Sequence, residues 1–398
     1  MPSLDETLKT RLAALREENL FRELRRVDSA QGPRIEIGGK TFLNFSSNDY
    51  LGLANHPALK EAAIKAVEKF GAGAGASRLI CGSLKPFHEL EAVLAAFKQT
   101  EAALTFSTGY AAAMGTITAL VGKDDVIILD KLVHASIVDA AKLSGAKLRV
   151  FGHNDLNDLE EKLRWATENP RRQTPDARTL LVTESIFSMD GDAAPLREIV
   201  ELKNKYGAWL MVDEAHATGI LGKNGRGLAD ELGVSRQIEI QMGTLGKALG
   251  ASGGYICGSR ALVDFLVNRA RSFIFSTAPV PAAAAAATAG IITVQSAEGE
   301  AKRKALFARL KEFHFALRPP PSALRSAIVP LILGDENKAL AAATKLREQN
   351  IFVPAIRHPT VAHGAARLRI TLTAAHSAED VATLVNALEQ FEIVNRKS

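Results

Sequence analysis

Apolar residues recur along this chain in two alternating patterns. From about residue 55 to residue 295, short apolar runs alternate with longer segments in which apolar residues return every three or four positions. The short runs predict seven buried strands, AALTF, DVIIL, KLRVF, TLLVTE, AWLMVD, IEIQM and GGYICG. HPALKEAAIKAVEKF and KPFHELEAVLAAFKQT predict helices between them. This alternation favours a mostly parallel seven-stranded sheet that helices cover on both faces.

The two ends of the chain carry a different pattern. Leucines at positions 4, 8, 12, 15 and 20 recur at helical spacing and predict one helix over residues 4–26. In RIEIGGKTFLNF, the pair Gly38-Gly39 predicts a hairpin between two short strands. After residue 295, AIVPLIL, IFVPAI and RLRITL predict strands, and ENKALAAATKLREQN and SAEDVATLVNALEQFE predict helices. The prolines at 319–321 predict a stiff turn or spacer.

These patterns predict an α/β fold built from three segments. Residues 55–295 would form a large domain around the parallel sheet, and residues 296–398 a smaller α+β domain. Residues 1–54 would supply a helix and strands that pack with the smaller domain. The length of 398 residues fits this division, because a single core rarely grows beyond about 250–300 residues.

Composition indicates a reduced, cytoplasmic protein with a small ligand. The net charge of +5 comes from 49 basic and 44 acidic residues spread along the chain, which suits a phosphorylated or carboxylated small molecule better than nucleic acid. Cys81 and Cys257 lie too far apart in sequence for a disulfide framework or a metal knuckle, so we predict no metal. The N-terminus lacks the apolar core of a signal peptide, and no run is long and apolar enough to span a bilayer.

Polar residues follow several predicted strands at the point where each strand ends. AALTF leads into Gly109 at the start of a helix-like segment, where exposed backbone N–H groups would form a phosphate cradle. AWLMV ends at Asp213, with His216 three residues on, and IEIQM runs into Thr244 and Lys247. Ligands of parallel sheets bind beyond the carboxyl ends of the strands, so these residues are candidates for one site.

Lys247 lies in the glycine-rich stretch GTLGKALG. A lysine in such a turn is ordinarily a solvated surface residue, and an aspartate at a strand end is ordinarily a helix cap. A desolvated, closely packed lysine instead becomes an amine nucleophile, because desolvation lowers its pKa. Together the candidates match the needs of one cofactor, pyridoxal 5'-phosphate. Its phosphate would bind at Gly109 and Thr244. Its aldehyde would react with Lys247, and its ring nitrogen would pair with Asp213.

Five motifs resemble those of the α-oxoamine synthases, fold-type I enzymes that use pyridoxal phosphate to condense an amino acid with an acyl-CoA and release CO2. They are NFSSNDYLGL, SIFSMDGDAAPL, MVDEAHATGILGKNGRG, GTLGKALG and IRHPTVAHGAARLRITLTAAH, and the resemblance runs over residues 20–385. It implies a homodimer with shared active sites. It also implies L-alanine and pimeloyl-CoA or pimeloyl-ACP as substrates. The alternatives within the family are glycine C-acetyltransferase and 5-aminolevulinate synthase, which use glycine.

The resemblance implies a role for each candidate residue. Lys247 would hold the cofactor covalently and move protons at the substrate α-carbon, while Asp213 would pair with the pyridinium nitrogen. His216 would hydrogen-bond the phenolic oxygen, and His134 would stack on the ring and help to position the substrate. Lys247, His134 and Asp213 are therefore the catalytic candidates. The remaining cofactor contacts would be Gly109, Tyr110, Ser188, Thr244 and, at the phosphate of the neighbouring subunit, Thr277.

The resemblance assigns the substrate to Arg22, Asn48, His134, Arg357, Thr360 and Arg369. Arginine suits carboxylates because its planar fork makes bidentate, permanently charged contacts. Surface ion pairs are the ordinary interpretation of Arg22 and Arg357, and Arg369 stays open between substrate binding and a structural pair. The family segment IRPPTVP is IRHPTVA here, with His358 and Ala362 in place of prolines. This change predicts a more flexible loop and an altered acyl preference.

Two hypotheses outside this family remain. GAGAGASRL at residues 71–79 fits the loose G-x-G-x-x-G/A pattern of dinucleotide-binding loops, which would suit a nicotinamide oxidoreductase. The segment follows a helix-like stretch, whereas the pattern requires a preceding strand. The other alternative is a non-catalytic partner subunit.

Overall fold

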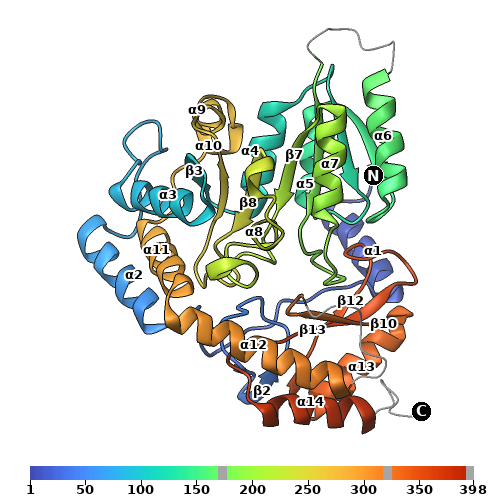
Figure 1. The fold of residues 1–398 in the computed structure, drawn as a ribbon. Coiled ribbons are helices and arrows are strands. Elements are labelled where there is room, and N and C mark those ends of the chain that lie inside the picture. The colour runs from blue at the N-terminus through green and yellow to red at the C-terminus, as the bar shows by residue number, and fades with distance from the viewer. Residues whose placement is uncertain (169–176, 317–324, 391–398) are drawn as a thin grey trace. The chain divides into compact units, whose positions relative to one another are not determined.

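The computed structural model describes residues 1–168, 177–316 and 325–390, and the chain divides into two compact units (Figure 1). One unit is Asn48–Lys304, and the other combines Met1–Ser47 with Ala305–Ser398. The N-terminal hairpin and the strands after residue 325 thus belong to the same unit. The proline run at 319–321 lies outside the described residues.

A seven-stranded sheet forms the centre of the larger unit. Its order is β3 (Ala102–Phe106), β9 (Gly254–Gly258), β8 (Ile240–Thr244), β7 (Trp209–Asp213), β6 (Thr179–Glu184), β4 (Val126–Asp130) and β5 (Lys147–Phe151). Only β9 runs antiparallel to its neighbours in this sheet, and the other pairs are parallel. The predicted mostly parallel seven-stranded sheet is confirmed.

Helices cover both faces of this sheet. α4 (Gly109–Leu120), α5 (Ala135–Ser144), α9 (Arg260–Arg269) and α10 (Arg271–Ile274) share one buried apolar cluster with alternate strand residues. α3 (Lys85–Lys98), α6 (Leu156–Glu168) and α7 (Leu196–Tyr206) contact the sheet without joining that cluster, and they cover the other face. α2 (Pro57–Phe70) packs on α11 (Pro281–Gln295), which also contacts α3. Burial of both faces explains why the strands are continuous apolar runs.

Shorter elements complete the larger unit. α8 (Leu228–Glu231) follows β7, and α12 (Ala297–Ala316) runs across the boundary at Lys304 into the smaller unit. In the described ranges, no helix combines the length and apolarity that crossing a bilayer requires.

The smaller unit contains two three-stranded sheets. In the first, β1 (Arg34–Ile37) and β2 (Lys40–Asn44) form a hairpin, and β11 (Ile351–Phe352) pairs with β2. The turn residues Gly38 and Gly39 have φ angles of 58° and 74°, a backbone region that glycine enters without steric cost. In the second sheet, β13 (Ala366–Thr371) lies between β10 (Ile328–Gly334) and β12 (Ala355–Ile356). α13 (Glu336–Glu348) packs on these strands, and α14 (Ala378–Gln390) follows β13.

Three elements differ from their predicted bounds. The first helix, α1 (Leu4–Glu17), ends well before residue 26, because Asn19 takes a left-handed φ of 57°. None of the residues of α1 is buried, so no packing stabilises a longer helix. The strand predicted at IEIQM begins at Ile240, since residues 235–237 form a short 3-10 turn. IFVPAI is two strands in different sheets, because Pro354 has no N–H to continue the ladder.

Candidate active site

The carboxyl ends of β3, β4, β6, β7 and β8 surround a cavity of about 180 Å3 in the larger unit. Its lining comprises Gly109, Tyr110, His134, Ser136, Glu184, Asp213, Ala215, His216, Met242, Thr244 and Lys247. The predicted cofactor residues other than Ser188 and Thr277 are all in this lining. The strand order thus brings residues from five separate segments, 109–110, 134–136, 184, 213–216 and 242–247, to one edge of the sheet.

Lys247 lies in a tight turn that follows β8. Leu245 N donates to Gly253 O at 2.9 Å and closes the turn. Gly250 adopts a φ of 68°, and a Cβ at this position would lie 2.6 Å from the backbone carbon of Leu53. Glycine at position 250 is therefore required for close backbone packing. This packing holds the lysine side chain in a half-buried position at the cavity.

A chain of polar contacts links Lys247 to Asn48. Lys247 Nζ lies 2.6 Å from His216 Nε2, and His216 Nδ1 lies 2.6 Å from the Tyr50 hydroxyl. That hydroxyl donates to Asn48 Oδ1 at 3.2 Å. Asn48 was predicted as a substrate residue, and in the structure Tyr50 links it to His216. Tyr50 was not predicted, although its motif NDYLGL was recognised.

Asp213 is the carboxylate at the end of β7. Burial raises the pKa of its carboxyl, and the positive charge of Lys247 opposes that rise. Its Oδ1 accepts a hydrogen bond from Ala215 N at 2.9 Å. A buried carboxylate of this kind is stabilised by an adjacent cation, and a protonated pyridine nitrogen is one.

Glu184 is a second buried carboxyl beside Asp213, which sequence analysis did not identify. It ends β6 and pairs with Asp213 in the parallel register. Burial raises its pKa well above the usual range, and the charge of Asp213 raises it further while Lys247 opposes this. The carboxyl accepts hydrogen bonds from the backbone N–H groups of His134 and Ser188. Glu184 therefore anchors two predicted cofactor residues. In the sequence, the acidic residue that ends the apolar run TLLVTE is its only signal.

His134 is the N-cap of α5 at the exposed mouth of the cavity. Its Nδ1 accepts a hydrogen bond from Ser136 N at 3.2 Å and lies 2.8 Å from the Ser136 hydroxyl. Desolvation lowers the pKa of the imidazole, Asp213 raises it, and Lys247 lowers it. A neutral ring is therefore favoured, which suits stacking on a flat aromatic ligand. The structural role as a cap and the predicted ligand role are compatible here.

The predicted phosphate cradle is the N-terminus of α4. Thr108 caps this helix by accepting a hydrogen bond from Ala111 N at 3.0 Å. The backbone N–H groups of Gly109 and Tyr110 donate to no other group among the described residues. A Cβ on Gly254 of the neighbouring strand would lie 2.6 Å from Gly109 N, so glycine is required for this approach. Free N–H groups at a helix N-terminus suit a phosphate, and the site fits pyridoxal phosphate.

Three other predicted cofactor residues have different surroundings. Thr244 donates its hydroxyl hydrogen to Gly253 O at 2.9 Å, so it also braces the turn that holds Lys247. Ser188 is buried in the loop after β6. Thr277 is exposed and forms an isolated bridge with Ser77, outside this cavity lining.

Two predicted substrate residues meet in the smaller unit. Arg22 Nη2 donates to the Thr360 hydroxyl at 3.4 Å and to the carbonyl of His358 at 3.1 Å. The ring of His358 stacks on His363 with centroids 3.9 Å apart. Apolar residues of α1 and the following segment join them around a cavity of about 540 Å3. Arg22 forms no ion pair with a described residue, so the interpretation as a surface ion pair does not hold within those ranges.

Arg357 and Arg369 also lie in the smaller unit. Arg357 donates to the carbonyls of Asn19 and Phe21, and this anchors the chain after α1. Arg369 lies on β13, is 7% exposed, and donates to the Thr371 hydroxyl at 3.1 Å. Both arginines therefore have structural partners in their own unit.

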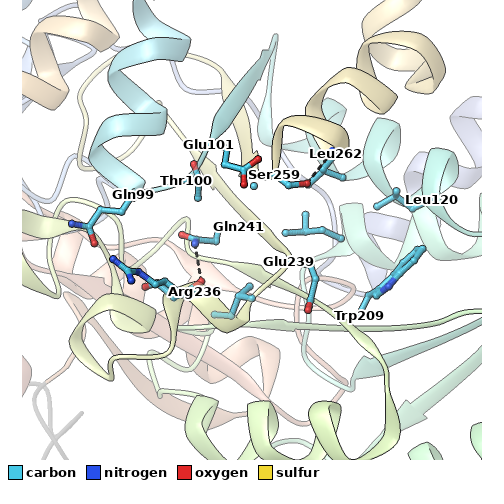
Figure 2. A pocket seen from close by; sticks show the side chains of 14 residues that line it. Gln99, Thr100, Glu101, Leu120, Trp209, Arg236, Glu239, Gln241, Ser259 and Leu262 are labelled. Atoms are coloured by element: carbon cyan, nitrogen blue, oxygen red, sulfur yellow. Dashed lines mark hydrogen bonds between the residues drawn. The ribbon is translucent and has the colours of Figure 1, made fainter.

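A larger cavity of about 570 Å3 lies at the opposite end of the same sheet (Figure 2). It is lined by residues at the amino ends of β7 and β8 and at the start of α9, including Trp209, Glu239 and Leu262. Glu239 already accepts hydrogen bonds from Lys203 Nζ at 2.6 Å and Leu210 N at 2.8 Å. The lining holds neither lysine nor histidine. Size alone therefore does not identify the reactive site.

Comparisons with known proteins identify the family. The class I and II aminotransferase family matches residues 40–388. The 8-amino-7-oxononanoate synthase of Anaeromyxobacter dehalogenans is 50% identical over 381 residues, which cover 95% of this chain and 93% of that protein. The protein of the same name from Geobacter sulfurreducens is 47% identical over 383 residues, with 96% of each chain covered. The chain belongs to the 8-amino-7-oxononanoate synthase family.

Solved structures agree with this membership. A serine palmitoyltransferase from S. paucimobilis with a bound PLP–myriocin adduct has a TM-score of 0.90 and 29% identity, and covers 99% of this chain and 100% of that chain. The 8-amino-7-oxononanoate synthase of Francisella tularensis has a TM-score of 0.74 and 28% identity, over 88% and 98% of the two chains. The predicted fold-type I fold, the α-oxoamine synthase family and the pyridoxal phosphate cofactor are confirmed. Members of the 8-amino-7-oxononanoate synthase family are transferases, so the prediction that this protein is an enzyme is also confirmed.

Proposed function

We propose that this protein condenses L-alanine with a pimeloyl thioester, on CoA or acyl carrier protein, to give 8-amino-7-oxononanoate, CO2 and the free thiol. The observation that carries the proposal is the 2.6 Å approach of Lys247 Nζ to His216 Nε2 in a cavity that also contains buried Asp213. Relatives at 45–50% identity over nearly the whole chain carry the name of this activity. Biotin biosynthesis is the pathway that this product serves.

The residues of the cavity would divide the work. The bound cofactor supplies an aldehyde for the lysine amine and a cationic ring that accepts electrons from the substrate α-carbon. Lys247 Nζ would remove and return the α-proton, and Asp213 would hold the proton on the ring nitrogen. His216 would orient Lys247 and hydrogen-bond the phenolic oxygen, while His134 would pack on the ring face. The other cofactor contacts would be Gly109, Tyr110, Thr244 and Ser188.

The substrates would be recognised by arginines together with neutral polar side chains. Asn48 and Arg369 would contact the amino-acid carboxylate, and His134 would help to position the substrate. Arg22, Thr360 and Arg357 would bind the acyl substrate. Support for this comes from the contacts of Arg22 and Thr360 beside a largely apolar cavity, since a pimeloyl chain combines methylene groups with one terminal carboxylate.

We also propose a cytoplasmic homodimer with shared active sites. In this arrangement, Thr277 would contact the phosphate in the neighbouring subunit, and its exposure in the single chain supports that role. The smaller unit, which includes Met1–Ser47 of the N-terminal segment, would act as the domain that binds substrate. Cys81 and Cys257 are both free thiols, which suits a reducing compartment.

Turnover with defined substrates tests the activity. Purified protein with pyridoxal phosphate, L-alanine and pimeloyl-CoA should release thiol and CO2 in equal amounts and form 8-amino-7-oxononanoate by mass spectrometry. Heptanoyl-CoA is the matched control, since it has the same chain length but no terminal carboxylate. Arg22→Ala should remove most of the preference for pimeloyl-CoA over heptanoyl-CoA. Faster turnover with glycine and acetyl-CoA, or with L-serine and palmitoyl-CoA, would contradict the proposal.

A further inference from the structure

The Tyr50 hydroxyl occupies a position from which it controls His216. Tyr50 is fully buried, and its hydroxyl lies 2.6 Å from His216 Nδ1 and 3.2 Å from Asn48 Oδ1. His216 is 5% exposed, so water competes little for its ring nitrogens. The other nitrogen, Nε2, lies 2.6 Å from Lys247 Nζ. The imidazole is thus held between a tyrosine and the lysine that reacts with the cofactor.

The hydrogens along this chain of contacts have one consistent direction. The Tyr50 hydroxyl has a single hydrogen, and it donates that hydrogen to Asn48 Oδ1. Its oxygen therefore faces His216 Nδ1 as an acceptor, which requires the hydrogen of the neutral imidazole to be on Nδ1. Nε2 then carries a lone pair that accepts a hydrogen from the Lys247 amine. No group in the chain is left with two donors or two acceptors face to face.

The backbone around Tyr50 keeps the hydroxyl in place. The Asp49 carboxylate accepts hydrogen bonds from Leu53 N at 2.7 Å and Ala54 N at 3.0 Å, which closes the turn that contains Tyr50. The backbone of this turn packs directly on the Lys247 turn, because a Cβ on Gly250 would lie 2.6 Å from Leu53. Tyr50 and Lys247 are therefore carried by two turns in direct backbone contact.

We infer that Tyr50 is a positioning residue that fixes the tautomer of His216, so that His216 Nε2 acts as the base beside the Lys247 amine. A nucleophile, a base and a third group that orients the base form a recurrent catalytic arrangement. An acceptor on Nδ1–H increases the basicity of Nε2 and fixes the ring orientation. When Lys247 bonds to the aldehyde carbon of the cofactor, its amine nitrogen would lose two hydrogens, one of them through His216 Nε2. Both hydrogens would end on the aldehyde oxygen, which would leave as water, so the step needs no further reactant.

This inference rests on the proposed role of Lys247, and the test separates the two. The probe is pyridoxal phosphate added to protein stripped of cofactor, and the readout is the rate at which the visible absorbance band grows as a function of pH. In Tyr50→Phe, the rate should fall about tenfold near neutral pH, and the rate–pH curve should move to lower pH by about one unit, because Nε2 becomes less basic. Asp213, Glu184 and His134 also titrate in the cavity, but they are common to all variants.

Tyr255→Phe is the matched control. Tyr255 is also fully buried in the larger unit, and its hydroxyl contacts Thr218 at 2.9 Å instead of His216. It should lower thermal stability without moving the rate–pH curve. In a double-mutant cycle, Tyr50→Phe should add little to His216→Ala, because the two residues act through one contact.

Each outcome has a definite meaning. If borohydride reduction fails to label Lys247 in the unmodified protein, the proposed function itself fails. If Lys247 is labelled but Tyr50→Phe leaves the rate–pH curve unchanged, the inference alone fails. It fails likewise if Tyr255→Phe moves the curve equally, or if the effects of Tyr50→Phe and His216→Ala add independently.

Discussion

The two ends of the central sheet carry cavities of opposite character. The cavity at the carboxyl ends has a volume of about 180 Å3, and the one at the amino ends about 570 Å3. Lys247, Asp213 and Glu184 all line the smaller cavity, and burial there raises the pKa of both carboxyl groups. In the larger cavity, Glu101 accepts a hydrogen bond from Arg260 N at 2.9 Å, and Glu239 is paired with Lys203. Reactive chemistry thus collects where polar groups are buried together, rather than where space is largest.

The parallel arrangement explains this asymmetry. Loops that leave the carboxyl ends of β3, β7 and β8 carry the phosphate turn, the Asp213 motif and the Lys247 turn. At the amino ends, Glu101 and Glu239 are paired locally and Arg236 is exposed to solvent, while the buried Gln241 Oε1 has no partner among the described residues. Substitutions at the two ends should therefore differ in their effect on catalysis by orders of magnitude, while their effects on stability are similar.

Lys247→Ala should have the largest effect. It removes the amine that bonds to the cofactor, so the product-forming rate should fall by about four orders of magnitude or more. The visible absorbance of the bound cofactor should also be lost. Lys247→Arg is the matched control, because it keeps a positive charge but is not a nucleophile, and it should be equally inactive. An active Lys247→Arg variant would show that charge, and not covalent chemistry, is what this position supplies.

Asp213→Asn should rank second. It removes the anion that stabilises a protonated ring nitrogen, and the loss of one member of a buried ion pair costs about 3–5 kcal/mol, or roughly 10^2–10^4-fold in kcat. Glu184→Gln is the matched control on the next strand. Burial raises the pKa of the Glu184 carboxyl well above its usual range, which favours the uncharged form, so the amide is a close replacement and the loss should stay within about tenfold. If steady-state kinetics gave equal losses of kcat for Asp213→Asn and Glu184→Gln, the charge could not be assigned to Asp213 alone.

Much of this comparison could be predicted from the sequence. Continuous apolar runs predicted the strands of the larger sheet, since burial on both faces requires them. The residues that follow those runs, such as Asp213 and Lys247, were predicted as one site because parallel strands end at one edge. Chemistry that directly follows a strand is therefore visible in the pattern.

Residues that act through distant contacts were not predictable in this way. Glu184 belongs to an apolar strand run, and its pairing with Asp213 depends on strand order, which no local pattern specifies. Tyr50 lies more than 160 residues before His216, and its role depends on how two turns pack. The length of α1 was also predicted wrongly, because leucine spacing continues to residue 20 while Asn19 ends the helix.

His153→Ala should have a smaller effect that depends on pH. His153 bridges Asp130 at 2.9 Å and Asp192 at 2.7 Å, and so holds the loop that contains Ser188. Although burial lowers the pKa of this imidazole, the two carboxylates outweigh it and raise the pKa to about 10 from 6.5. Because the folded pKa lies above the unfolded one, the stabilisation is complete below pH 6.5 and is lost as the pH rises through about 10.

Urea unfolding of the unmodified protein and His153→Ala measures this effect. The difference in unfolding free energy should be largest at about pH 6 and should narrow at about pH 9.5. His153→Gln, which retains hydrogen bonding but not the charge, should also show a large difference at about pH 6 and a small one at about pH 9.5. A gap for His153→Ala that is independent of pH would indicate lost packing against Phe187, whose ring lies 4.3 Å away, instead of lost charge.

Arg236→Ala should have the smallest effect, and it tests the other side of the comparison. Arg236 lines the larger cavity at the amino end, is exposed, and forms no hydrogen bond or ion pair with any residue in the described ranges (Figure 2). Removing it should change kcat/KM by less than about twofold and the unfolding free energy by less than about 0.5 kcal/mol. A tenfold loss of kcat/KM at unchanged stability would mean that the amino-end cavity is coupled to the reacting groups, and the division between the two ends of the sheet would no longer hold.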